Sequence, residues 1–360
     1  MQAQASANVA AYVHAILKDT TDTSSIDVGT YVLSKTDALL AVTEMDTDVE
    51  GAFKLLLKAT GAKHVPELLP KLTKDTTNAT LKLRILAEVF NSLPASDALR
   101  FQTLVAIINY AGATNQIGLV KGYFNEIDAL LAGVASADRQ RVYLSIADLL
   151  EKEADSQTQS LLFLEKYLNL FEAEKDVSAA KPVAIRAAVA VVKAPLEAFV
   201  AHVELLHLKA VQQLKGADKI FDLLEIFTAK TLADFVAFEK ASPAVLTSYG
   251  LDREALVSHM RLLTLCSYPT GHDAIAYADI ERTLQVPAAD VEQWVVKAIT
   301  ANLIHAKIDQ LGRSVTITRS LQRGFGPAEW ASLHTKLSAY QANVGNLLAT
   351  IRSARAQQQK

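Results

Sequence analysis

The sequence contains a single cysteine, and this scarcity excludes several kinds of site. Cys266 has no second cysteine with which to form an internal disulfide or to build a cysteine zinc site. A chain that does not use disulfides fits a reducing compartment. Cys266 lies between Leu265 and Ser267 in an apolar helical stretch without neighbouring cations. We therefore expect a core thiol rather than a reactive one.

Long hydrophobic runs are also missing, although half of the residues are hydrophobic. The richest region, residues 183–208, is interrupted by Arg186, Lys193, Glu197 and His202, whereas a spanning helix needs about 18 or more residues with few or no charges. The N-terminal residues lack the basic segment, apolar segment and cleavage site of a secretory signal. We expect a soluble, cytoplasmic protein with no membrane contact.

Motifs typical of enzymes are absent. The sequence has no Gly-x-Ser-x-Gly, no phosphate loop that ends in Gly-Lys-Ser or Gly-Lys-Thr, and no complete Gly-x-Gly-x-x-Gly. His202 and His207 are five residues apart and lie on different sides of a helix, whereas the zinc motif of metalloproteases places them at i and i+4. We expect no catalytic residue, no bound metal and no cofactor.

The net charge of the first 300 residues is negative, and that of the last 60 residues is positive. The chain has a net charge of −3, yet residues 301–360 contain eight lysines and arginines against Asp309 and Glu329. No block of five like charges occurs there. The asymmetry is a weak indication of a basic end that meets an acidic partner or nucleic acid.

Helical patterns, in contrast, are abundant from about residue 50 to residue 270. Apolar residues recur at spacings of three and four, as in Val142, Ile146, Leu149 and Leu150. Pairs of such segments recur at roughly 40 residues, the scale of stacked two-helix repeats. Because only a neighbouring pair can cover each apolar stripe, we expect residues 1–200 to form a solenoid of helical repeats.

Residues 201–322 show a different order of elements. Helical segments over 201–252 are followed, over 253–322, by helix, short strand, helix, helix and two strands, which is the order of a winged helix. The two strands are predicted from alternating apolar and polar residues in 304–309 and 315–318, with Gly312 in the turn. A single hairpin is marginal alone, so we expect it to lean on Trp294 and Ile299.

The last segment, residues 323–360, predicts one long helix with a regular apolar seam. Its apolar residues step alternately by three and four, which is the heptad pattern of helices that pack together. These seam residues are Trp330, Leu333, Leu337, Tyr340, Val344, Leu347 and Ile351. Burying each is worth about 1.5–3 kcal/mol, so the seam requires a partner helix. That helix belongs either to the same chain or to another protein, and the regular period and terminal position favour another protein.

Several short strings between residues 200 and 350 are distinctive. They are Leu223-Leu224-Glu225-Ile226-Phe227, residues 260–264, Lys307-Ile308-Asp309-Gln310, Phe325-Gly326 and Trp330. These strings resemble the PCI-domain family, which is shared by scaffold subunits of the proteasome lid, the COP9 signalosome and eukaryotic translation initiation factor 3. Within this family they are most similar to the subunit M branch of initiation factor 3. Upstream of about residue 200 the similarity is mainly architectural.

This resemblance implies a non-enzymatic scaffold that assembles with other PCI and MPN subunits of initiation factor 3, binds the small ribosomal subunit through the complex, and supports recruitment of mRNA and initiator tRNA. It also implies winged helices aligned edge to edge and C-terminal helices in a shared bundle. We therefore assign the seven seam residues to the bundle, and Arg313, Val315 and Ile317 to the wing edge. A PCI scaffold of the signalosome or of the proteasome lid remains an alternative.

A winged-helix module that binds nucleic acid is the second alternative. The outward face of the third helix carries a net negative charge and no arginine to read guanine, so we expect no DNA binding. Arg313, Arg319 and Arg323 are the candidates for contact with RNA phosphate, although solvated charges explain them more simply. The outward residues of the third helix are Asp290, Glu292, Gln293, Val296, Lys297 and Thr300.

Overall fold

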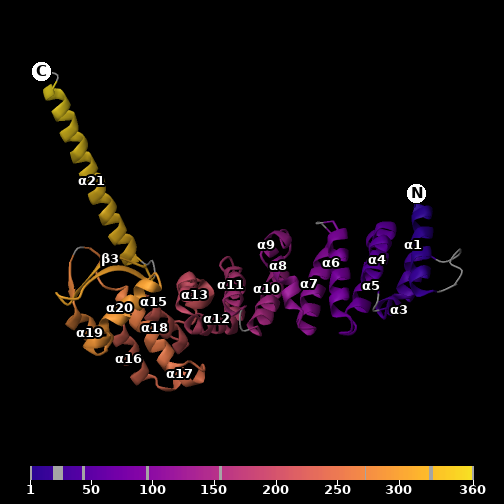
Figure 1. Cartoon of the computed structure of the whole chain (residues 1–360), viewed down its shortest axis with the longest axis horizontal. Helices are drawn as coiled ribbons and strands as arrows, with labels where there is room; N and C mark the ends of the chain where they lie inside the picture. The colour runs from indigo at the N-terminus through magenta and orange to yellow at the C-terminus, as the bar shows by residue number, and fades with distance from the viewer. Residues whose placement is uncertain are drawn as a thin grey trace. The chain divides into compact units, whose positions relative to one another are not determined.

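The structure is a computed structural model of the whole chain, and it describes residues 2–18, 27–42, 45–94, 97–153, 156–271, 273–323 and 327–358. These residues are mainly helical (Figure 1), and the chain divides into two compact units, residues 1–170 and 171–360. The predicted fold class is confirmed: stacked helices precede a winged helix with a small sheet, and a long helix follows it. The limits predicted at residues 200 and 322 stay predictions.

Successive helices in the first unit pack against one another: α1 contacts α4, α4 contacts α6, α6 contacts α7, α7 contacts α10, and α10 contacts α11. The elements are α1 (Gln2–Leu17), α2 (Val28–Ser34), α3 (Thr36–Leu40), α4 (Asp46–Thr60), the 3₁₀ turn η1 (Gly61–His64), α5 (Val65–Leu72), α6 (Ala79–Ser92), α7 (Ala98–Ala113), α8 (Ile117–Phe124), α9 (Ile127–Leu130), α10 (Ser136–Glu151) and α11 (Gln157–Asn169). Helices therefore begin at residue 2, whereas the helical pattern in the sequence is clear only from about residue 50. Helices α2 and α3 are too short to show a clear period.

The apolar faces predicted from the sequence form the core of this unit. Val142, Ile146 and Leu150 of α10 are buried, and so are Leu161, Leu164 and Leu168 of the adjacent α11. Phe163 of α11 adds ring contacts to Phe124 and Tyr143, with ring centroids 5.9 and 6.3 Å away. Each helix thus buries one stripe on its neighbour, which is why the repeats form a stack.

The second unit begins with shorter helices and ends with the winged helix and a long terminal helix. Its elements are η3 (Ser178–Ala180), α12 (Lys181–Lys193), α13 (Leu196–Ala201), η4 (Val203–His207), α14 (Lys209–Gln212), α15 (Lys219–Ala229), α16 (Leu232–Ala241), α17 (Ala244–Ser248), α18 (Arg253–Leu265), β1 (Ile275–Ala276), α19 (Tyr277–Leu284), η5 (Ala288–Asp290), α20 (Val291–Thr300), β2 (Ile304–Asp309), β3 (Ser314–Ser320) and α21 (Pro327–Gln358).

Polar caps define where the main helices of this unit begin. The Asp218 carboxylate accepts a hydrogen bond from the Ile220 N–H at the start of α15, and Asp252 accepts one from the Glu254 N–H at the start of α18. Thr231 and Asp234 form a capping box at the start of α16. Each cap satisfies an N–H group that has no partner within its own helix.

An aromatic cluster forms the core of the helical part of this unit. The Phe227 ring on α15 is 1% exposed, and it packs edge to face against Phe199 of α13 and Phe235 of α16, with ring centroids 5.9 Å from each. Such pairs add about 0.5–1.5 kcal/mol to the burial of the rings. This cluster joins α13, α15 and α16 into one core.

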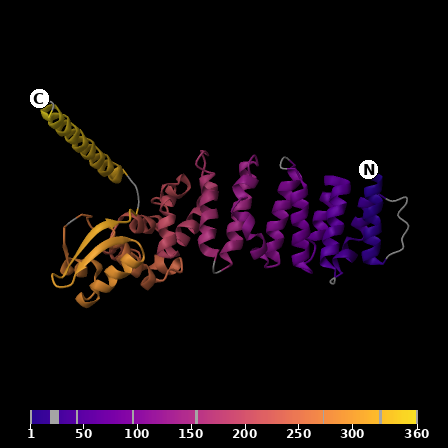
Figure 2. The same ribbon diagram turned by 45° about the horizontal axis from the view of Figure 1, so that its top comes forward.

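The winged helix consists of α18, α19, α20 and a three-stranded antiparallel sheet in the order β1-β3-β2. Figure 2 shows β2 and β3 side by side over the helices of this unit. The predicted hairpin is confirmed, with Ile304 opposite Ser320 and Ile308 opposite Val315. Because β1 pairs with the other side of β3, the second strand of the hairpin lies at the centre of the sheet.

Trp294, one of the two residues expected to support the hairpin, makes two cation–π contacts. Its ring is half-buried between two cations, with the Arg261 guanidinium 5.1 Å and the Lys297 ammonium 4.6 Å from the ring centroid. Cation–π attraction of this kind keeps an aromatic ring at a surface. The fully buried side chains of α20 are instead those of Val291, Val295 and Ala298.

Candidate interaction surfaces

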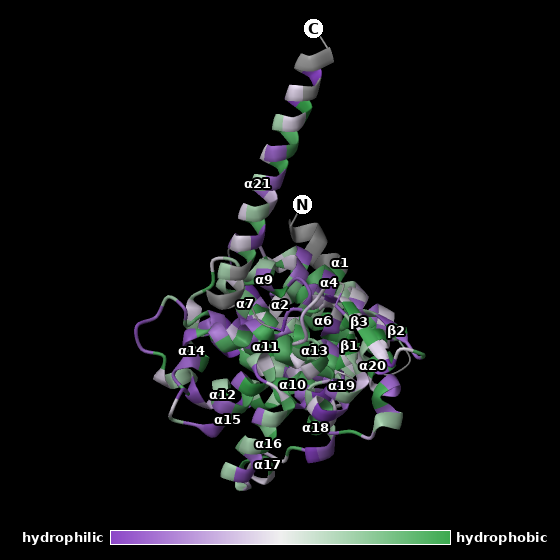
Figure 3. Ribbon diagram, turned by 90° about the vertical axis from the view of Figure 1, so that its left-hand side faces the viewer, coloured by the Kyte–Doolittle hydropathy of each residue, from purple (hydrophilic) through white to green (hydrophobic). Residues whose placement is uncertain are grey.

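The seam of α21 is an apolar surface that the described residues of the second unit leave uncovered. The helix is continuous over 32 residues, and hydrophobic and hydrophilic residues alternate along it (Figure 3). Leu333 is half-buried, and the other six seam residues keep 38–69% of their surface exposed. Those six are Trp330, Leu337, Tyr340, Val344, Leu347 and Ile351. The rest of the described chain thus does not bury this seam, and its role in a bundle stays a prediction.

The flanks of the seam favour an acidic partner. Among the residues of α21 whose side chains the structure describes, none is acidic, while Lys336, Arg352 and Arg355 are exposed. Leu348, 48% exposed, widens the apolar stripe beside Leu347. In helix pairs, charges beside the seam select the partner. A partner with an apolar stripe and carboxylates on its flanks fits this helix.

The wing-edge prediction is wrong for two of its three residues. The side chains of Val315 and Ile317 are 0% and 1% exposed, because the period of two directs both toward the helices that β3 covers. The backbone of β3 is paired on both sides as well: Ile275 of β1 lies opposite Val315, and the Gly271 N–H donates to the Ile317 carbonyl at 2.9 Å. Neither side chain is free to contact another protein.

Strand β2 supplies the open edge instead. Within the described residues it pairs with β3 alone, so one side of its backbone lacks a neighbouring strand. His305, Lys307 and Asp309 are exposed along it, and Ile308 is half-buried. An open edge of this kind can accept a strand from another chain. The sequence predicted a free edge but could not show to which strand it belongs.

The third wing residue, Arg313, is exposed, and so is Arg319. Arg313 has a left-handed backbone with φ of 46°. The loop before it is held in place, since the Gly312 N–H donates to the Asp309 carboxylate at 2.9 Å and the Gln310 amide donates to Glu292 at 2.8 Å. Both arginines therefore stay candidates for contact with a partner or with RNA phosphate.

Arg323, the third candidate for an RNA contact, is buried and is not part of the exposed wing surface that carries Arg313 and Arg319. It is 7% exposed, and its guanidinium donates to the carbonyl oxygens of Lys230 at 2.8 Å and Phe227 at 3.4 Å, and to the Ser267 hydroxyl. Burial lowers the pKa of this guanidinium. The side chain ties the segment after β3 to the end of α15, a contact between residues about 95 positions apart that no local pattern reveals.

The outward face of α20 does not resemble a DNA-reading surface. Gln293, Val296, Lys297 and Thr300 are exposed, and Glu292 is engaged by the Tyr277 hydroxyl at 3.0 Å as well as by Gln310. No arginine lies on this face. The face offers no bidentate donor of the kind that recognises guanine.

Cys266 is the core thiol expected from the sequence. It is buried, and burial raises its pKa to about 11. Among the described residues there is no group of three or more metal-binding side chains. In the same part of the chain, no helix combines the length and the apolar character needed to cross a membrane.

Comparisons with known proteins find similarity to PCI-domain proteins. A PCI domain model matches residues 238–319. "Eukaryotic translation initiation factor 3 subunit M" of Dictyostelium discoideum is 29% identical over 88% of this chain and 82% of its own length. Proteins of the same name from Aspergillus terreus and Emericella nidulans are 32% and 31% identical over 77% of this chain, but this chain covers 62% and 64% of them, less than two thirds.

Proposed function

We propose that this chain, which matches a PCI domain model over residues 238–319 and is similar over most of its length to subunits M of eukaryotic translation initiation factor 3, is a non-catalytic scaffold subunit of that factor. The observation that carries the proposal is the long similarity to relatives that share one name, together with the PCI match at residues 238–319. In this role the chain assembles with PCI and MPN subunits in the cytoplasm. Through the complex it supports binding of the small ribosomal subunit and recruitment of mRNA and initiator tRNA.

Two surfaces of the second unit support assembly as the function. The α21 seam offers six exposed apolar side chains, and burying them would contribute roughly 10 kcal/mol before the cost of association. The β2 edge offers backbone groups to a neighbouring strand. A helix that joins a bundle and an edge that joins a sheet are the contacts of a scaffold.

Purification of the tagged full-length chain from its own cells tests this proposal. We expect mass spectrometry to recover the other subunits of initiation factor 3 in constant ratio to the chain. Recovery of signalosome or proteasome-lid subunits would assign the chain to one of those complexes instead. A chain that elutes alone in native size-exclusion chromatography would contradict every scaffold assignment.

Direct contact with RNA is a second candidate function, which the exposed Arg313 and Arg319 favour. Each contact with an RNA phosphate contributes about one to the slope of log affinity against log salt concentration, the salt slope. Changing both arginines to glutamine is therefore expected to lower the slope of log affinity against log salt by about two and to weaken binding similarly for all RNA sequences. Fluorescence anisotropy with a labelled RNA measures both quantities.

The matched control for this pair is Arg282→Gln, since Arg282 is an exposed arginine of the same unit that is paired with Asp279 at 2.7 Å. It removes one charge from a place outside the wing and is expected to leave the salt slope unchanged. If the double variant binds RNA with the affinity and salt slope of the unmodified chain, the wing is not an RNA contact.

A further inference from the structure

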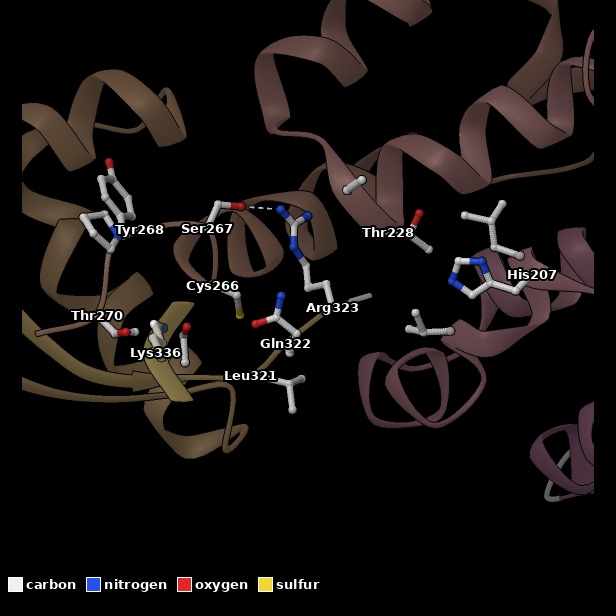
Figure 4. A pocket seen from close by; sticks show the side chains of 15 residues that line it. His207, Thr228, Cys266, Ser267, Tyr268, Thr270, Leu321, Gln322, Arg323 and Lys336 are labelled. Atoms are coloured by element: carbon white, nitrogen blue, oxygen red, sulfur yellow. Dashed lines mark hydrogen bonds between the residues drawn. The ribbon is translucent and has the colours of Figure 1, made fainter. Parts of the chain in front are cut away.

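A pocket of about 570 Å³ opens within the second unit, beside the buried Arg323. Figure 4 shows its lining side chains, which come from η4, the end of α15, the loop after α18, the end of β3 and the segment after it, and α21, which contributes Lys336. Its volume lies in the range of about 300–1,000 Å³ that is typical of ligand sites. We call it the Arg323 pocket.

The charge in this pocket is entirely positive. Among the described residues that line it, Arg323, His207 and Lys336 carry or can carry a positive charge, and none is an aspartate or a glutamate. Among the described residues, the Arg323 guanidinium donates to neutral oxygens, two carbonyls and one hydroxyl. A buried cation whose partners among the described residues are all neutral lacks charge compensation from those residues, so the pocket attracts an anion.

The remaining walls combine apolar and polar groups. Leu206 and Leu321 line the pocket together with Thr270, Ser320 and Gln322. Thr270 and Gln322 are exposed to solvent, and the other three are half-buried. A small inorganic anion would contact the guanidinium and leave the apolar walls uncovered. An acidic side chain carried by a peptide fills the polar part with its carboxylate and covers the apolar walls with its neighbours.

The position of the pocket along the chain links it to the assembly surface. Arg323 lies four residues before Pro327, where α21 begins, and four residues span at most about 14 Å. A protein that packs on the first turns of the seam is therefore within reach of the pocket. The absence of acidic side chains among the described residues of α21 favours the same kind of partner.

We propose that the Arg323 pocket receives an acidic peptide segment of the neighbouring protein that packs on α21. This inference rests on the proposed scaffold function and deepens it, since it states the chemistry by which one partner is selected. The partner's carboxylate lies against the Arg323 guanidinium, and its adjacent apolar side chains contact Leu206 and Leu321.

Opposite charges introduced at Thr270 test this proposal. Thr270 lines the pocket and is exposed, so that both Thr270→Glu and Thr270→Lys leave the core intact. Each variant is expressed as the full chain with one tag, together with the unmodified chain under a second tag. The ratio of the two chains in the purified complex is then measured by mass spectrometry. We expect the Glu variant to be incorporated about tenfold less well and the Lys variant to within about twofold of the unmodified chain, because like charges repel and opposite charges attract across an interface.

Thr300→Glu on the exposed face of α20 is the matched control, and we expect it to be incorporated normally. Equal loss for Glu and Lys at position 270 would indicate an uncharged occupant and overturn the proposal. Normal incorporation of both would show that nothing acidic docks there and would overturn it as well. The unmodified chain in the same purification tests the proposed function separately, because recovery of subunits from another complex would contradict that function. The incorporation of the Glu and Lys variants relative to the unmodified chain would still test the pocket in that case.

A photo-crosslinking residue placed at Ser320 in the full chain identifies the occupant directly. Ser320 lines the pocket and is half-buried. We expect cross-linked peptides from one protein, rich in aspartate or glutamate. Cross-links to nucleic acid, or to a peptide without acidic residues, would overturn the proposal.

Discussion

Replacing Leu337 and Tyr340 of α21 by aspartate is expected to reduce incorporation of the chain into its complex by more than about a hundredfold. The two side chains are 58% and 69% exposed in the isolated chain, and each contributes about 1.5–3 kcal/mol when it is buried. The aspartates would in addition place two charges in an apolar interface without partners. The competition between tagged chains described above measures the loss.

The matched control places the same charges on the opposite face of the same helix. Ser338 and Ala342 are exposed and are not seam residues. Replacing both by aspartate changes the net charge and the helix propensity of α21 by amounts similar to those caused by the seam pair. We expect normal incorporation of the control pair and a normal circular dichroism spectrum for both pairs. Equal incorporation of the seam and control pairs would mean that the seam is not an interface.

Replacing Phe227 by alanine is expected to lower the free energy of unfolding of the second unit by about 3–5 kcal/mol, the usual cost of removing a phenylalanine from a core. The ring is buried between Phe199 and Phe235. Arg323 donates to the carbonyl of the same residue, so that relaxation around the cavity is restricted. Urea unfolding followed by Trp294 fluorescence measures this loss in a Trp330→Phe background, where Trp294 is the remaining tryptophan.

Phe238→Ala provides the comparison, because Phe238 is half-buried on the neighbouring α16. Removing its ring leaves a smaller cavity, so we expect the free energy of unfolding to fall by less than half of the amount caused by Phe227→Ala. Similar losses for the two variants would show that Phe199, Phe227 and Phe235 do not form the main core of the helical part of the second unit.

The sequence by itself determined the elements and their order. The spacing of three and four residues predicted the helix faces that pair α10 with α11, the spacing of two predicted the hairpin of β2 and β3, and the heptad seam predicted a single long α21. The core position of Cys266 followed from its apolar neighbours. All of these patterns are local, so that a few adjacent residues are sufficient to reveal them.

Only the tertiary structure decided which groups face solvent. Pairing of Ile275 with Val315, across 40 residues of chain, places β3 at the centre of the sheet and leaves the edge to β2. Hydrogen bonds from Arg323 to Phe227 and Lys230 bury an arginine that sequence alone places among solvated charges. Such contacts depend on the folded path of the chain between distant residues, and neither composition nor periodicity contains that path.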